Sequence, residues 1–325
     1  VQRDPLKLAL YIAFFPQLVA GPIVRYTTVA EEIDERHESV SEFSAGAVRF
    51  LFGLGKKMLL ANAVARIADA AFAAVMPSVL FAWLGAVAYT FQIYFDFSGY
   101  SDMAIGLGRM FGFHFLENFN YPYVARSVTE FWRRWHISLS TWFRDYVYIP
   151  LGGNRCSRVR NVWNLFVVWF LTGMWHGASW NFVIWGLFHG TFLVLERIFP
   201  IEKILHFRLL KSIYTLLVVI VAWVFFRAET LGSAWAYLNR MFVPYDMESY
   251  SKYLSNEFVY VAVLALASCG FGAMLYRRLF ALIGRENWGN AVVRAVNPAF
   301  CAVIAYFSVL LLASNTYNPF IYFRF

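Results

Sequence analysis

The stretch that decides the fold is residues 172–181, which read TGMWHGASWN and place His176 between glycines and tryptophans. It lies inside a long apolar run, residues 162–195, which contains no Asp, Glu, Lys or Arg and no histidine other than His176 and His189. An ionisable side chain in hydrocarbon is costly and usually has a function. The flanking glycines weaken the helix and permit close approach of the backbone. The pattern therefore predicts a reactive group at membrane depth.

The length of this apolar run predicts that it does not cross the membrane as one straight helix. One crossing needs ~20 apolar residues, and residues 162–195 exceed that length. A segment that is too long must tilt, break or turn back. We expect the break at residues 173–177, where two glycines flank Met-Trp-His.

The composition is typical of a multi-pass membrane protein. The residues are 60% hydrophobic, 20% aromatic and only 15% charged, whereas a soluble domain is ~45–50% apolar and ~25% charged. The net charge of +8 comes from basic residues in short segments between apolar runs, as the positive-inside bias predicts for cytoplasmic loops. No groove-reading motif accompanies this charge, so we expect no nucleic-acid partner. Three cysteines without regular spacing argue against a disulfide framework or a zinc cluster.

Apolar segments separated by polar ones predict the membrane spans. Residues 6–24 are interrupted by two prolines, which break a helix and favour a bent or re-entrant segment. The charged residues 31–42 predict an exposed loop. Spans are expected at residues 79–97, 213–226, 258–276 and 298–313. The predicted fold class is an all-α polytopic membrane helix bundle with broken or re-entrant helices, in a single domain over residues 1–325.

A second group of functional residues lies on residues 130–146, which we expect to form one helix. At ~100° per residue, its apolar and polar side chains gather on different sides. The apolar arc holds Phe131, Trp132, Trp135, Leu139, Trp142, Phe143 and Tyr146. The polar face holds Arg133, His136, Ser140 and Arg144. This face either lies at the lipid headgroups or lines a cationic pocket for a phosphate-bearing donor such as coenzyme A.

A third polar group shares one side of a single predicted helix. Its members are Gln92, Asp96, Gly99, Asp102, Gly106 and Arg109. Acidic residues in a membrane segment face the bundle interior or water. In one interpretation Asp102 pairs with Arg109 and the glycines allow close helix packing. In the other, the group lines the same cavity as the histidines.

His176 is the strongest candidate for a catalytic residue. A neutral imidazole can take the proton of a hydroxyl group that attacks an acyl thioester. Asn181, Ser179 or backbone N–H groups at the broken helix could stabilise the resulting oxyanion. No serine lies in a Gly-x-Ser-x-Gly pattern, so direct transfer is simpler than covalent serine catalysis. The alternative for a lone membrane histidine is an interhelix hydrogen bond, and this packing role is the interpretation for His189.

Four segments of the chain carry a family resemblance. They read FFPQLVAGPI at residues 14–23, FWRRWHISLS at 131–140, FRDYVYIPLGGN at 143–154 and TGMWHG at 172–177. Together they resemble the membrane-bound O-acyltransferase family, over most of residues 6–195 and the closing NPFIYFRF. The resemblance is greatest to the bacterial branch that O-acetylates alginate, cellulose and peptidoglycan. It is more distant to the D-alanyl transfer protein of teichoic acid.

The resemblance implies that His176 is the catalytic histidine and His136 the second active-site residue. It implies a helix bundle around a central tunnel in a bacterial cytoplasmic (inner) membrane. Full-length members carry additional amino-terminal helices, so the chain is expected to be the carboxy-terminal portion of a longer family fold. The resemblance also implies a cytoplasmic thioester donor, a periplasmic acetyltransferase partner and an extracytoplasmic polysaccharide acceptor. The donor is expected to be acetyl-CoA or an acylated carrier protein.

The sequence thus predicts an O-acetyltransferase in which His176 is the general base and His136 orients it or polarises the thioester carbonyl. Candidate donor or substrate contacts are Arg133, Ser140, Arg144, Trp175, Asn181 and Asp102. No bound cofactor is expected, and no metal, because no third ligand accompanies the two histidines. Two alternatives stay open. One is a transporter or channel that uses Asp96, Asp102 and His176, and the other is a non-catalytic scaffold for a partner enzyme.

Overall fold

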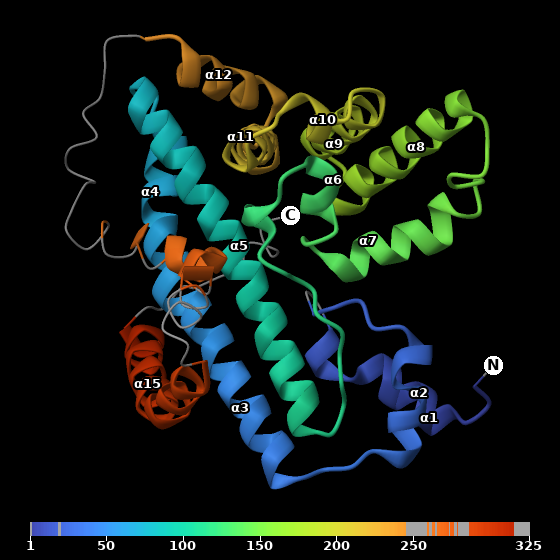
Figure 1. The fold of residues 1–325 in the computed structure, drawn as a ribbon, viewed down its shortest axis with the longest axis vertical. Helices are drawn as coiled ribbons and strands as arrows, with labels where there is room; N and C mark the ends of the chain where they lie inside the picture. The colour runs from blue at the N-terminus through green and yellow to red at the C-terminus, as the bar shows by residue number, and fades with distance from the viewer. Residues whose placement is uncertain are drawn as a thin grey trace. The chain divides into compact units, whose positions relative to one another are not determined.

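A computed structural model describes residues 2–18, 21–244 and 286–314, together with scattered residues between 259 and 278. In this part of the chain the regular elements are helices (Figure 1), which confirms the predicted all-α class. The α-helices are α1 (Pro5–Ala13), α2 (Tyr26–Glu35), α3 (Val40–Gly55), α4 (Asn62–Ala73), α5 (Val79–Met110), α6 (Val128–Trp132), α7 (Ile137–Phe143), α8 (Arg158–His176), α9 (Trp180–Ile198), α10 (Ile201–Ile204), α11 (Arg208–Arg227), α12 (Leu231–Phe242) and α15 (Glu286–Ser314). Short 3₁₀ turns cover Phe15–Gln17 and Pro122–Val124, and π-helical turns cover Lys56–Ala61, Arg144–Tyr148 and Ala267–Phe271.

Three helical segments are long and apolar enough to cross a membrane. They are Val79–Met110, Arg208–Arg227 and Asn297–Ser314. Each contains a span predicted from the sequence, at residues 79–97, 213–226 and 298–313 respectively. The fourth predicted span, residues 258–276, is described only in part, because six of its residues lie outside the described part of the chain. The chain therefore has the helices of a membrane protein.

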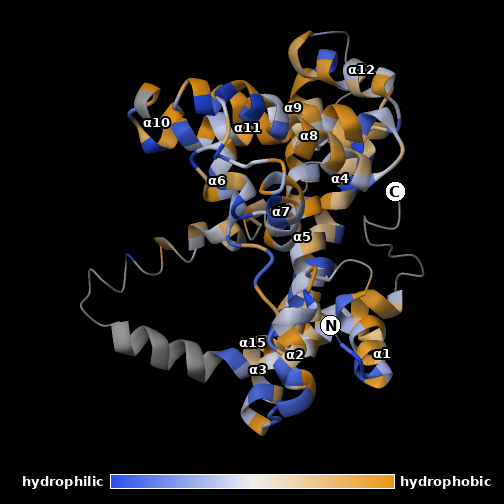
Figure 2. Ribbon diagram, turned by 90° about the vertical axis from the view of Figure 1, so that its right-hand side faces the viewer, coloured by the Kyte–Doolittle hydropathy of each residue, from blue (hydrophilic) through white to orange (hydrophobic). Residues whose placement is uncertain are grey.

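The amino-terminal apolar segment is bent, as its prolines predict. Helix α1 ends at Ala13, and a 3₁₀ turn containing the buried Pro16 follows it. None of the residues of α1 is buried, and Leu6 and Ile12 are 79% and 60% exposed. Figure 2 shows the hydrophobic residues along this helix. An exposed apolar helix fits a lipid environment better than water.

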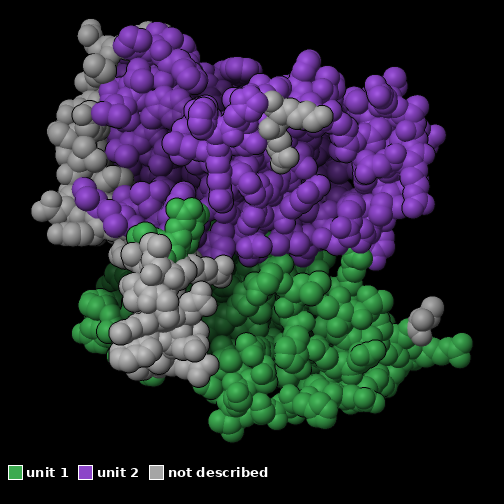
Figure 3. Space-filling model, viewed as in Figure 1, with its two compact units in different colours: residues 1–62, 94–118, 272–324 green, residues 63–93, 119–271, 325 purple. Residues whose placement is uncertain are grey.

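The described helices group into two compact units, coloured separately in Figure 3. Unit 1 comprises residues 1–62, 94–118 and 272–324. Unit 2 comprises residues 63–93 and 119–271, together with residue 325. Helix α5 contributes its first half to unit 2 and its second half to unit 1.

In unit 1, glycines bring α3 and α5 into backbone contact. A Cβ atom on Gly99 would lie 2.7 Å from the carbonyl oxygen of Gly53, and one on Gly106 would lie 2.6 Å from that of Gly46. Small residues permit such close helix crossings in membranes. The structure therefore confirms the interpretation in which Gly99 and Gly106 allow close helix packing.

The predicted ion pair between Asp102 and Arg109 is wrong. The Asp102 carboxylate instead lies 2.8 Å from Arg49 and 2.5 Å from Lys56, while Arg109 binds Glu42. Residues 102 and 109 are two helical turns apart on α5, at about 1.5 Å of rise per residue, whereas α3 crosses α5 directly. The partners from the crossing helix are closer than the partner on the same helix.

The predicted exposed loop at residues 31–42 is shorter than expected. Helix α2 continues to Glu35, and α3 begins at Val40 after Ser39, whose hydroxyl caps it by accepting the backbone N–H of Glu42. Only the link between these helices is irregular. Serine is a favoured N-cap because its side chain satisfies a free N–H group of the first turn.

In unit 2, the long apolar run turns back on itself, as predicted. Helix α8 ends at His176, and Gly177 adopts φ 156° and ψ 165° before α9 starts at Trp180. The two helices pack together through glycine, since a Cβ atom on Gly173 would collide with Phe182 O and one on Gly186 with Trp169 O. The break thus falls at the end of the predicted stretch and leaves His176 at a helix terminus.

Candidate active site

His136 lies at a break between two helices, so the predicted single helix over residues 130–146 is wrong. Helix α6 ends at Trp132, α7 begins at Ile137, and a π-helical turn follows α7. His136 has φ 44° and ψ 55°, the left-handed conformation. Only one other non-glycine residue in the described part of the chain, Tyr121, has a positive φ. Such a conformation costs about 1–3 kcal/mol and persists where the surrounding structure enforces it.

The break rearranges the two predicted faces. Phe131, Trp132, Trp135, Leu139 and Phe143 are buried, as expected for the apolar arc, but Trp142 and Tyr146 are exposed. His136 is only 3% exposed, whereas Arg133 and Arg144 are exposed. The three cationic or titratable groups of the predicted polar face therefore do not share one environment.

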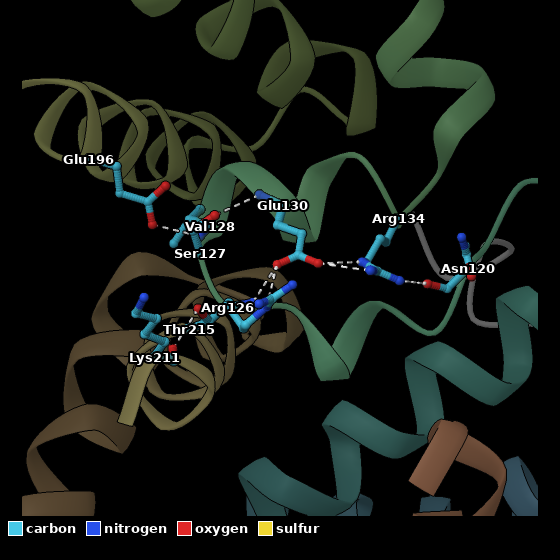
Figure 4. Close-up of polar contacts among 9 residues, drawn as sticks. All are labelled: Asn120, Arg126, Ser127, Val128, Glu130, Arg134, Glu196, Lys211 and Thr215. Atoms are coloured by element: carbon cyan, nitrogen blue, oxygen red, sulfur yellow. Dashed lines mark hydrogen bonds and ion pairs between the residues drawn. The ribbon is translucent and has the colours of Figure 1, made fainter. Parts of the chain in front are cut away.

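A carboxylate from α9 holds the helix that leads to His136. Glu196 accepts hydrogen bonds from the backbone N–H of Val128 at 2.6 Å and of Thr129 at 2.9 Å. It also accepts one from the Thr129 hydroxyl at 2.7 Å. Ser127 caps the same end of α6 by accepting the N–H of Glu130 at 3.0 Å, and Figure 4 shows Glu196 beside this helix terminus. A negative charge at a helix N-terminus is stabilising.

Glu130 and Arg134 fix the next turn of the chain. Glu130 accepts the backbone N–H of Arg126 at 2.9 Å and the Arg134 side chain at 2.8 and 3.0 Å. Arg134 in turn donates to the carbonyl oxygen of Asn120 at 3.0 Å (Figure 4). Partial burial opposes the charged carboxylate, but these hydrogen bonds outweigh it and hold the pKa of Glu130 below its usual value. The segment before His136 is thus anchored on both sides.

Removing the α9 carboxylate should loosen this anchor. We expect Glu196→Ala to lower the free energy of unfolding by about 1–3 kcal/mol, because two backbone N–H groups and one hydroxyl lose their acceptor. The measurement is the thermal unfolding midpoint of the purified protein in detergent. Glu229→Ala is the matched control, since Glu229 is exposed and should leave the midpoint unchanged. Equal midpoints for the two variants would contradict the anchoring role.

His176 is enclosed by aromatic rings at the end of α8. Its ring centroid lies 4.9 Å from that of Trp175, 4.9 Å from Trp185 and 5.2 Å from Phe226. Trp185 comes from α9 and Phe226 from α11, so three helices build the enclosure. The imidazole itself is half-buried.

The structure brings His136 and His176 together within unit 2. The Trp175 ring lies 4.9 Å from the His176 ring and 6.0 Å from the His136 ring, measured between centroids. Both imidazoles therefore lie near one indole ring. Two groups able to transfer protons, held by separate helix ends, can serve one acid–base reaction.

The other candidate residues occupy different positions. Arg133 is exposed, and Ser140 is half-buried in the first turn of α7, where its N–H bonds to the carbonyl oxygen of His136. Arg144 binds Asp145 at 2.6 Å, and this hydrogen bond raises the pKa of Arg144. Asp102 belongs to unit 1, where cations of α3 and of the adjoining π-helical turn take up its charge.

Asn181 is buried at the start of α9 and makes one side-chain hydrogen bond. Its side-chain amide donates to the carbonyl oxygen of Ala228 at 2.5 Å, and its own oxygen has no hydrogen-bond partner among the described residues. The amide nitrogen carries two hydrogens, and the bond to Ala228 uses only one of them. Asn181 therefore stays a candidate for the oxyanion role, together with Ser179 and backbone N–H groups.

Sequence reasoning missed Glu196 and the aromatic enclosure. Glu196 is the first charged residue after the apolar run 162–195, which was the available signal for it. Trp185 and Phe226 carry no pattern that separates them from ordinary apolar residues. The described residues contain no group of three His, Cys, Asp or Glu side chains that could hold a metal ion.

Two adjoining histidines at helix ends, in a chain with membrane-length helices, define a membrane protein with a candidate acid–base site. Residues 3–226, which include both histidines, match the membrane-bound O-acyltransferase family, and the chain belongs to this family. It is therefore an acyltransferase by family.

Individual relatives agree with this assignment. The chain is 41% identical over 352 residues to the probable alginate O-acetylase of Azotobacter vinelandii, covering 99% of this chain and 70% of that protein. It is 42% identical over 244 residues to the peptidoglycan O-acetyltransferase of Helicobacter pylori, covering 73% of this chain and 46% of that protein. It is 30% identical over 216 residues to the teichoic acid D-alanyltransferase of Bacillus subtilis, covering 61% and 53%.

Proposed function

We propose that the protein transfers acetyl groups from a thioester donor to a polysaccharide outside the cytoplasmic membrane of a bacterium. The observation that carries this proposal is the pairing of His136 and His176 around Trp175. Relatives named as an alginate O-acetylase and a peptidoglycan O-acetyltransferase support the acetyl group and the polysaccharide acceptor.

The reaction needs only proton transfer and orientation from the protein. His176 takes the proton from the attacking hydroxyl, whose oxygen forms a bond to the thioester carbonyl carbon. The tetrahedral intermediate then collapses, the carbon–sulfur bond breaks, and the thiolate receives the proton from His176. His136 donates a hydrogen bond to the developing oxyanion. The proton balance closes within one turnover, so no further acid or base is required.

The donor carries its acetyl group on a thioester, either in acetyl-CoA or on an acylated carrier protein. Arg133, exposed three residues before His136, is the cation best placed to bind a phosphate of such a donor. Arg144 is a weaker candidate because Asp145 already neutralises it. A periplasmic acetyltransferase is the expected partner, which would receive the acetyl group first and pass it to the polymer.

A transporter is less well supported. Its ion path would use Asp96 and Asp102, yet Asp96 binds Lys57 at 2.5 Å and Asp102 binds two cations. Both carboxylates therefore already have cationic partners within unit 1. Because cations neutralise Asp96 and Asp102, an acyltransferase is better supported than an ion path through these residues.

The decisive assay follows labelled acetyl groups. Full-length protein in membrane vesicles is given acetyl-CoA labelled in the acetyl group, together with polysaccharide and the periplasmic fraction of its source. We expect alkali-labile label on the polymer and release of free coenzyme A. If acetyl-CoA is hydrolysed but the polymer carries no label, the acceptor assignment is refuted. If acetyl-CoA stays unchanged while an acylated carrier protein supplies the label, the carrier protein is the donor.

A further inference from the structure

His189 is the other histidine of the apolar run, and the proposed reaction does not use it. Its side chain is 0% exposed. Neither ring nitrogen has a hydrogen-bond partner among the described residues, so the interhelix hydrogen bond expected for this residue is absent there. Buried polar groups without partners are rare and need an explanation.

The rings of four tryptophans surround His189, and we call this group the tryptophan cage. Ring centroids of the cage lie 4.9 Å (Trp132), 5.6 Å (Trp169), 5.3 Å (Trp185) and 6.5 Å (Trp223) from the His189 centroid. They come from α6, α8, α9 and α11, all of which belong to unit 2. The cage is therefore the place where four helices meet.

The cage has too many hydrogen-bond donors for its acceptors. The indole nitrogens of Trp132, Trp185 and Trp223 are buried and, like those of His189, have no partner among the described residues. Each indole N–H can only donate, while a neutral imidazole offers one donor and one acceptor. A group that supplies acceptors is needed to satisfy these donors. Water supplies two lone pairs and two hydrogens, and buried waters typically bridge such groups.

The cage also joins the two parts of the candidate active site. Trp132 lies on α6, four residues before His136, and its ring is 4.5 Å from that of Trp169 on α8, the helix that ends at His176. Trp185 contacts both histidines of the apolar run, at 4.9 Å from His176 and 5.3 Å from His189. A shift in the cage would therefore move the walls around both catalytic candidates.

We propose that the tryptophan cage binds one or more water molecules through His189, and that His189 is thereby a positioning residue for the His136–His176 pair. The effect of His189 on catalysis rests on the proposed function. The binding of water in the cage is independent of that function. The water accepts hydrogen bonds from indole N–H groups and donates one to the unprotonated nitrogen of His189. This arrangement fixes the Trp132 and Trp185 rings, and with them the geometry of the reacting groups.

The first test compares three variants of the full-length protein in the vesicle assay. His189→Phe keeps a ring but removes both nitrogens, and we expect kcat to fall about 10- to 100-fold with KM unchanged, because misplaced catalytic groups lose rate rather than affinity. His189→Gln restores a donor and an acceptor and should recover most of kcat, with the pH profile of the wild type. His206→Phe, at an exposed histidine, is the control and should change nothing. Wild-type kcat in His189→Phe, or a His189→Gln variant as slow as His189→Phe, would overturn the proposal.

The second test is an experimental structure of the full-length protein at a resolution that shows water. We expect a water within hydrogen-bond distance of a His189 nitrogen and at least one indole nitrogen. Indole N–H groups that instead point at neighbouring ring faces, with no water present, would overturn the proposal. If His189→Phe does not fold, Trp223→Phe removes one donor of the cage and carries the same kinetic expectation.

The two proposals fail in different ways. If His176→Ala retains full activity, the proposed function fails, while a water found in the cage still supports the binding site. If His176→Ala is inactive but His189→Phe has wild-type kcat, the positioning role alone fails.

Discussion

Replacing His176 with alanine should reduce acetyl transfer about 10²- to 10⁴-fold, the range that general acid–base catalysis contributes. The imidazole lies at the terminus of α8, half-buried beside His136 and enclosed by rings from α9 and α11. Alanine removes the proposed proton acceptor but not the helix, because His176 is the last residue of α8 and Gly177 caps the helix in any case. The measurement is the initial rate of labelled acetyl transfer in vesicles, at equal amounts of folded protein.

The control for this prediction is His206→Ala, which removes an exposed histidine outside the enclosure. It should keep the wild-type rate. The thermal unfolding midpoint of His176→Ala should stay close to that of the wild type, which separates lost chemistry from lost structure. If His176→Ala transfers acetyl groups at the normal rate, the protein is a scaffold for another enzyme rather than the catalyst. A His176→Ala variant that loses solute flux, in a protein that shows no acetyl transfer, would favour a transporter.

Local sequence pattern predicted those parts of the fold that depend on hydrophobicity and glycine. The spans within α5, α11 and α15 follow from apolar length alone. The turn at Gly177 follows from a run that is too long for one crossing and contains helix-weakening residues. The glycine contacts between α3 and α5 follow from small residues spaced along one helix face.

Interactions between distant segments could not be read in the same way. The pattern of residues 130–146 continues through His136 without a glycine or proline, so nothing local marks the helix break. The break is held by contacts with residues outside this segment. Glu196 on α9 accepts from the start of α6, and the carbonyl oxygen of Asn120 accepts from Arg134. The ion pairs of Asp102 with Arg49 and Lys56 were also not predictable from one helix, because both cations lie on a different segment of the chain. Periodicity describes one helix at a time, whereas these contacts join two.

The left-handed backbone of His136 allows its chemical and conformational roles to be separated. We expect His136→Ala, His136→Asn and His136→Gly all to lose acetyl transfer by about 10²-fold or more, because each removes the imidazole proposed to donate to the oxyanion. Their stabilities should differ. Glycine adopts φ 44° freely and asparagine tolerates it, whereas alanine is strained there by about 1–2 kcal/mol.

The measurements are the initial transfer rate and the thermal unfolding midpoint for each of the three variants. The asparagine and glycine proteins should unfold at higher temperature than the alanine protein and yet be equally inactive. That result would mean that the strained turn serves to place an imidazole that lies 3% exposed beside Trp175. Activity that instead rises with stability, so that asparagine or glycine restores the rate, would mean that only the turn matters. In that case His176 would act without a second histidine.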